Sequence, residues 1–124
     1  MPRVVHFEVI AQDPERAVQF YGDVFGWTAN KWEGPAEYWL VMTGDCDKPG
    51  INGGIVRTRD TSQPALTVNT IEVENVDDYV AKAEAAGGTC AVPKMPIPGV
   101  GWLAYCKDPD GVLFGLMQSD PQAG

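Results

Sequence analysis

The sequence has few of the residues on which common site chemistries depend: one histidine, two serines and three cysteines in 124 residues. The cysteines, Cys46, Cys90 and Cys106, are odd in number and lack C-x-x-C spacing. We therefore expect free thiols rather than a disulfide framework or a zinc cluster. Neither Ser62 nor Ser119 lies in a nucleophile-elbow motif, and the glycine-rich phosphate motifs are absent. Serine-hydrolase chemistry is excluded, and nucleotide binding has no support.

Basic residues and long apolar runs are also scarce. The sequence has nine Lys and Arg and seventeen Asp and Glu, and the resulting net charge of -8 disfavours nucleic acid and anionic membrane surfaces as partners. No apolar run approaches the ~18 residues that cross a bilayer. The 44% hydrophobic content is enough for one compact core. We expect a soluble, cytoplasmic protein; its negative charge would attract a cationic ligand, although it also serves plain solubility.

The chain contains an internal repeat. A shift of 62 positions, which places His6 on Val68, superimposes the apolar segment 4–10 on 66–73 and Gly26 on Gly88. The total length is twice this shift. Two similar modules, 1–60 and 65–119, are therefore expected within one domain, 1–124, about a pseudo-twofold axis and joined by a polar linker at 59–64. Clefts at such junctions commonly bind ligands.

Each half reads as β-α-β-β-β. Asp13 and Asn75 are candidate N-caps of two amphipathic helices. Strands are expected at 4–10, 27–32, 37–43, 51–58, 66–73, 89–92, 101–107 and 112–118. The proline-rich segment 93–99 is expected to be a loop, since proline cannot donate to a regular strand ladder. The tetrad 108–111, with proline second, predicts a type I turn whose carboxylates need no metal.

Several motifs in this order resemble the vicinal oxygen chelate superfamily, which includes glyoxalase I, bleomycin-resistance proteins and extradiol dioxygenases. They are His-Phe-Glu at 6–8, Asp-Pro-Glu-Arg-Ala at 13–17, Phe-Gly-Trp at 25–27 and Lys-Asp-Pro-Asp-Gly at 107–111. The resemblance covers nearly the whole chain. It implies an α+β fold in which two modules form curled mixed sheets, with helices outside and a metal or ligand inside the resulting cups.

The resemblance also implies where a metal would be held. In metal-using members the ligands come from the first and last strands of both modules, which here point to His6, Gly53, Val68 and Gly115. Three of these four lack a donor side chain, and one imidazole cannot hold a divalent ion usefully. A metal site would have to recruit carboxylates such as Glu8 or Glu72, or a one-residue strand slip that brings in Asn52 or Asn69. The slip is awkward because it turns the side chains to the other face of the strand. We therefore expect neither metal nor other cofactor.

Six residues are candidates for binding a ligand in the cup: His6, Glu8, Trp39, Asn52, Trp102 and Tyr105. His6 could carry a proton or donate a hydrogen bond to a ligand, or be satisfied by a neighbouring backbone carbonyl. Glu8 shares the strand face of His6, and a carboxylate pair with Glu72 is conceivable, although solvated rim charges are the simpler interpretation. The aromatic residues of strands 37–43 and 101–107 face either the cup or the core, and the sequence leaves this open.

The leading functional hypothesis is a metal-independent protein that binds a small organic molecule, aromatic or cationic, in the manner of bleomycin-resistance proteins. The alternative is a metal-dependent lyase, isomerase or dioxygenase of the glyoxalase I or extradiol type. A non-catalytic dimerising or regulatory protein is a third possibility. A homodimer is expected because open strand edges are normally covered by another element or chain.

Overall fold

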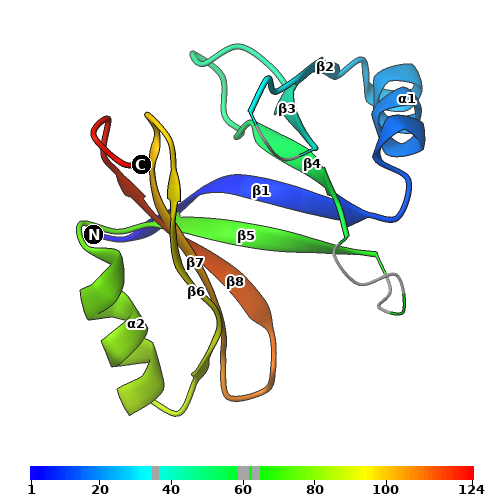
Figure 1. Cartoon of the computed structure of the whole chain (residues 1–124). Helices are drawn as coiled ribbons and strands as arrows, with labels where there is room; N and C mark the ends of the chain where they lie inside the picture. Colours follow the sequence, from blue (N-terminus) through cyan, green and yellow to red (C-terminus); the bar gives the residue numbers. More distant parts are fainter. Residues whose placement is uncertain (35–36, 59–61, 63–64) are drawn as a thin grey trace. The chain divides into compact units, whose positions relative to one another are not determined.

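A computed structural model describes residues 1–34, 37–58, 62 and 65–124 of the chain. The elements are β1 (Arg3–Ala11), α1 (Pro14–Phe25), β2 (Thr28–Lys31), β3 (Tyr38–Met42), β4 (Gly53–Arg57), β5 (Leu66–Glu72), α2 (Val76–Ala85), β6 (Thr89–Ile97), β7 (Gly101–Lys107) and β8 (Leu113–Ser119). Their order is β-α-β-β-β twice over, so the predicted α+β class and repeat are confirmed (Figure 1). The predicted linker at 59–64 lies almost wholly outside the described residues.

The chain divides into two compact units. The first unit comprises residues 6–68, and the second comprises residues 1–5 together with 69–124. The first carries strands in the order β2-β3-β4-β1, and the second carries β5-β8-β7-β6. In each unit one pair is parallel, β1 with β4 or β5 with β8, and the remaining neighbours are antiparallel. Both sheets are therefore mixed, as predicted.

Both helices begin at the predicted caps. The Asp13 carboxylate accepts a hydrogen bond from the Arg16 amide, and the Asn75 side chain accepts one from the Asp78 amide. Helix α1 ends at Gly26, whose φ of 75° is the left-handed conformation that glycine adopts without strain. At the start of α2 the Gln118 side chain also accepts a hydrogen bond from the Val76 amide at 3.0 Å. Each helix is thus fixed by local side-chain chemistry that the sequence displays.

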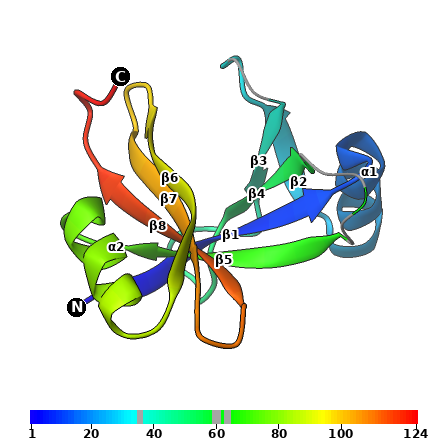
Figure 2. The ribbon, with the colours of Figure 1, turned by 60° about the horizontal axis from the view of Figure 1, so that its bottom comes forward.

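Each helix covers one face of the sheet in its own unit. Helix α1 packs on β2 and β4, and α2 packs on β6, β7 and β8 (Figure 2). The first core contains Ala11, Trp39, Val41 and Ile55, and the second contains Val73, Val76, Ala104, Cys106 and Leu116. No helix among the described residues is long and apolar enough to cross a membrane.

The proline-rich segment corrects one prediction. Residues 93–97, expected to be a loop, belong to β6, which runs from Thr89 to Ile97. This strand is the outermost of its unit, and its pairing with β7 shifts register between Cys90 and Val92 and again between Val92 and Met95. Proline is tolerated at such edges and bulges because its missing amide is not needed there. The expected turn at 108–111 is confirmed: the Gly111 amide donates to the Asp108 carbonyl at 2.9 Å.

Candidate functional site

The strongest cluster of functional side chains lies in the first unit, on the sheet face opposite α1. His6 Nε2 lies 2.7 Å from the Tyr38 hydroxyl, and the two rings are stacked with an interplanar angle of 14°. Glu8, two residues after His6 on β1, points to the same face. Its side chain is only 5% exposed. An imidazole, a phenol and a buried carboxylate thus share one face of this sheet.

Burial controls the charge of His6. It lowers the pKa of the imidazole below its ordinary value, and this effect outweighs the opposing attraction of the Glu8 carboxylate. His6 is therefore neutral at pH 7, with one ring nitrogen that donates and one that accepts. Its partner at Nε2 is the Tyr38 hydroxyl and not the backbone carbonyl that the sequence allowed. Because either ring nitrogen of neutral His6 can carry the proton, the imidazole can act toward a ligand as a hydrogen-bond donor or as an acceptor.

A glycine makes room for this pair. Gly54 is the partner of Glu8 in the β1–β4 register. A Cβ atom on Gly54 would come within 3 Å of the Tyr38 ring and hydroxyl, so only a residue without a side chain leaves Tyr38 its place. The consecutive glycines of β4 therefore have separate tasks: Gly53 admits the Phe7 ring on the helix side, and Gly54 admits Tyr38 on the side of His6.

The register also corrects one of the four positions considered for a metal. Gly53 pairs with Phe7 and faces α1, whereas Gly54 occupies the face of His6 and Glu8. In the second unit the matching partners are Thr70 and Gly115. Both last-strand positions are glycine, so neither supplies a donor, and Val68 is apolar and fully buried.

The donors that remain fit a resident metal poorly. His6 Nε2 is engaged with Tyr38, and Glu8 is the carboxylate that shares its face. Within the described ranges no group of three or more His, Cys, Asp or Glu side chains is arranged to hold an ion. A stable divalent site needs three or four protein ligands. The absence of a resident metal therefore stays a prediction.

Two predicted ligand-binding residues of the first unit are occupied elsewhere. Trp39 is 8% exposed and packs in the core beneath α1, with Lys31 Nζ 5.4 Å from its ring centroid. Asn52 accepts a hydrogen bond from the Thr43 amide at 2.9 Å and holds together the two ends of the segment between β3 and β4. Their roles in ligand binding stay predictions that these contacts do not support.

The two aromatic candidates of the second unit lie on opposite faces of β7. Trp102 packs against the core beneath α2, donates from Nε1 to Asp120 at 3.0 Å, and has Lys94 Nζ 4.9 Å from its ring centroid. Tyr105 pairs with Gly115 and lies on the face away from α2. Of these two, Tyr105 alone occupies a face on which it could meet a ligand.

Tyr38 is the site residue that sequence reasoning undervalued. The sequence places Tyr38 and Trp39 on opposite faces of one strand without saying which face is covered by the helix. The structure resolves this: Trp39 shares its face with Val41 and Ile55, and Tyr38 shares its face with His6. The available signal was Gly54, since a strand glycine often marks the close approach of another group.

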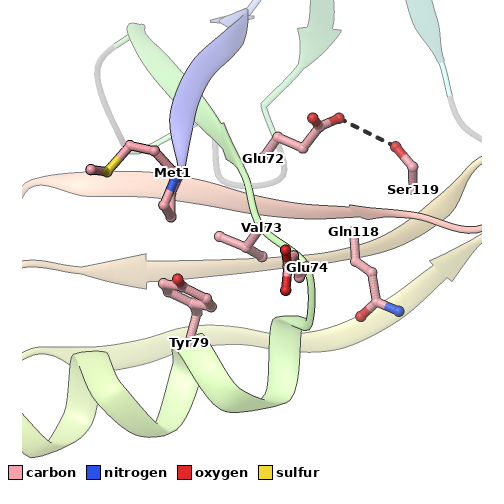
Figure 3. A pocket seen from close by; sticks show the side chains of 8 residues that line it. Met1, Glu72, Val73, Glu74, Tyr79, Gln118 and Ser119 are labelled. Carbon is pink, nitrogen blue, oxygen red and sulfur yellow. Dashed lines mark hydrogen bonds between the residues drawn. The ribbon is translucent and has the colours of Figure 1, made fainter.

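A separate cavity of about 580 Å³ lies in the second unit (Figure 3). Its lining comprises Met1, Pro2, Glu72, Val73, Glu74, Tyr79, Gln118 and Ser119. Several of its polar groups already have partners, because Ser119 Oγ donates to Glu72 at 3.3 Å and Gln118 caps α2. The cavity contains none of His6, Glu8 and Tyr38. We therefore prefer the His6 face, where a buried carboxylate shares the sheet face with a half-buried imidazole and phenol, as the candidate site.

Comparisons with known proteins agree with this architecture. The chain is 31% identical over 117 residues to the “Putative glyoxylase CFP32” of Mycobacterium bovis and to its namesake in Mycobacterium tuberculosis. The alignment covers 93% of this chain but 43% of each relative, so the chain spans less than half the length of the curated relatives it matches.

Solved structures share the fold at lower identity. Methylmalonyl-CoA epimerase from Mycobacterium tuberculosis has a TM-score of 0.67 at 15% identity, covering 94% of this chain and 87% of that one. The protein BH1468 from Bacillus halodurans has a TM-score of 0.69 at 13% identity, covering 99% and 98%. The family model described as Glyoxalase/Bleomycin resistance protein/Dioxygenase superfamily matches residues 3–116. The chain therefore belongs to the glyoxalase, bleomycin resistance protein and dioxygenase superfamily.

Proposed function

We propose that this chain binds a small organic molecule on the His6 face of the first unit without a resident metal. The observation that carries the proposal is the convergence of the neutral His6–Tyr38 pair and the buried Glu8 carboxylate on one face. Buried polar groups cost free energy unless they are hydrogen-bonded, and they concentrate where a protein binds or reacts. The core-forming face of the same sheet is apolar by contrast.

The chemistry of these groups indicates the class of ligand. The carboxyl oxygens of Glu8 accept hydrogen bonds and suit a hydrogen-bond-donating group. The imidazole of His6 and the hydroxyl of Tyr38 are groups that can each donate or accept a hydrogen bond, and the net charge of -8 attracts cations at long range. A neutral or cationic molecule with a planar polar end therefore suits the face better than a polyanion.

The rival function, a metal-dependent lyase, isomerase or dioxygenase, agrees with the name of the putative glyoxylase relative, but the described residues contain no group of three or more His, Cys, Asp or Glu side chains that could hold a metal. Its ligand positions on the last strands are Gly54 and Gly115, and Val68 on β5 adds no donor. A methylmalonyl-CoA epimerase of the same fold has been solved with methylmalonyl-CoA and NH4+, so acyl-CoA thioesters belong in any ligand panel. Their negative charge makes them the less favoured class here.

The test is a thermal-shift and calorimetric screen of cationic heteroaromatics, neutral aromatics and acyl-CoA thioesters, run with and without chelator. A ligand that uses the His6–Tyr38 pair should lose about 2- to 13-fold in affinity in Tyr38→Phe, the equivalent of a hydrogen bond of ~0.5–1.5 kcal/mol. Tyr21→Phe is the matched control. It also removes one phenol hydroxyl, but from a ring that stacks on Trp27 beside the first core and not on the His6 face. The chelator should change neither affinity nor melting temperature.

Two results would contradict the proposal. One is a ligand whose binding is abolished by chelator and restored by a divalent ion. The other is equal loss of affinity in Tyr38→Phe and Tyr21→Phe, which would show that the hydroxyl on the His6 face has no particular part in binding.

A further inference from the structure

Two of the three cysteines face each other across a strand pair. Strands β6 and β7 lie side by side (Figure 2), and Cys90 on β6 and Cys106 on β7 are direct partners in their antiparallel register. Such partners have Cα atoms about 4.5–5.5 Å apart, and a disulfide needs about 4.4–6.8 Å. Partners in this position project their side chains to the same side of the sheet. A bond between the two sulfur atoms therefore needs no rearrangement of the sheet.

The two thiols differ in access. Cys106 is fully buried in the core beneath α2, and Cys90 is half-buried on the outermost strand of its unit. Burial, followed by the neighbouring Cys90, raises the pKa of the Cys106 thiol. A reagent from solution therefore reaches Cys90 first, while Cys106, its partner across the strand pair, remains a protonated thiol.

From this geometry we propose that Cys90 and Cys106 form a reversible thiol–disulfide modification site that small-molecule disulfides such as glutathione disulfide oxidise. The Cys90 thiolate attacks one sulfur of glutathione disulfide, breaks its S–S bond and releases one glutathione thiolate, which takes up a proton. Cys106 then loses its proton and attacks the Cys90 sulfur of the mixed disulfide, which releases the second glutathione. Two protein thiols are oxidised and one disulfide is reduced, so the exchange balances.

The bond would join strands at a weak point of the sheet. The β6–β7 register shifts immediately after Cys90, and β6 has no neighbour on its other side in the sheet of its unit. A disulfide at Cys90 closes the hairpin that contains both register shifts and restricts the unfolded chain. Oxidation is thus expected to stabilise the second unit without touching His6, Glu8 or Tyr38, which belong to the first.

The experiment uses the folded chain with Cys46→Ser, which removes the exposed third thiol. After incubation with glutathione disulfide, intact-mass analysis should show the loss of two hydrogens and no adduct, and non-reducing peptide mapping should find Cys90 joined to Cys106. The melting temperature should rise on the order of 3–10 °C and return after dithiothreitol. Adding Cys106→Ala should trap the glutathione adduct on Cys90, and adding Cys90→Ser should leave no modification.

Each contrary result overturns the proposal. These results are a stable glutathione adduct in the Cys46→Ser protein, two thiols that remain unmodified, or a disulfide that forms only in denaturant. If Cys106→Ala fails to fold, the Cys90→Ser variant still decides the question. Its substitution is at the half-buried position, and the same protein must then neither lose hydrogens nor gain an adduct.

Discussion

Replacing Gly54 by alanine tests whether Tyr38 is held where the candidate site needs it. The backbone at Gly54 does not have a positive φ, so alanine introduces no conformational strain. Its Cβ would overlap the Tyr38 ring and hydroxyl, and the ring has to move away. The hydrogen bond between Tyr38 and His6 is then lost.

The magnitude follows from three contributions. Overpacking costs about 1–3 kcal/mol, and a lost hydrogen bond costs about 0.5–1.5 kcal/mol. Replacing a strand glycine regains roughly 0.5–1 kcal/mol by restricting the unfolded chain. The free energy of unfolding should therefore fall by about 0.5–4 kcal/mol. Gly44→Ala is the matched control, because its Cβ would have nothing within 4 Å, and it should change stability by less than about 0.5 kcal/mol.

Urea unfolding followed by tryptophan fluorescence measures both variants, and a double-mutant cycle assigns the cause. In a Tyr38→Ala background the ring and its hydrogen bond are gone, so Gly54→Ala should stabilise the protein by roughly 0.5–1 kcal/mol. The coupling free energy, which is the clash plus the lost hydrogen bond, should be about 1.5–4.5 kcal/mol. An equal cost of Gly54→Ala in both backgrounds would refute the reasoning, because the clash would then lie elsewhere.

Three further predictions concern charge, core and assembly. The single histidine, His6, should titrate by NMR with a midpoint below about 6.5, since burial lowers its pKa, and a midpoint above 6.5 would contradict this. The contribution of neutral His6 to the free energy of unfolding is complete above the unfolded-state pKa of about 6.5 and is lost as the pH falls through the lower pKa of the folded state. His6→Gln should therefore reduce the loss of stability in acid. Trp102→Ala should lower the free energy of unfolding by about 3–5 kcal/mol in urea titrations, as for a core residue, and leave any ligand affinity on the His6 face unchanged; a well-folded variant that no longer binds would reverse this assignment. Sedimentation should show a homodimer, because the outer strands β2 and β6 and the exposed Phe20 and Phe25 offer surface for a second copy, and a clean monomer at micromolar concentration would count against it.

Local signals were sufficient for most of the fold. Asp13 and Asn75 cap their helices as the sequence indicated, and the repeat of β-α-β-β-β follows from a hydrophobic pattern written twice. The segment 93–97 could not be read this way. Whether a proline-rich stretch forms a strand depends on its place at the edge of a sheet and on register shifts with β7, which are tertiary facts.

The candidate site was less accessible from sequence. The position of His6 and Glu8 on one face followed from strand alternation, and the structure agrees. Strand alternation could not decide between Tyr38 and Trp39. It places the two residues on opposite faces of the strand but does not tell which face the helix covers. The same ambiguity explains why Trp102 was predicted to bind a ligand, although the structure places it beneath α2. It also explains why Gly53 was considered as a metal-ligand position, although the register places Gly54 on the face of His6.

The central claim is that the chain binds its ligand without a resident metal. Elemental analysis of the protein purified without chelator, with metal content expressed per chain, tests this claim most directly. Binding without a resident metal predicts zinc, nickel, iron and manganese well below one equivalent per chain, because Gly54, Val68 and Gly115 carry no donor side chain. A full equivalent of one tightly held metal, lost in His6→Ala, would contradict the account.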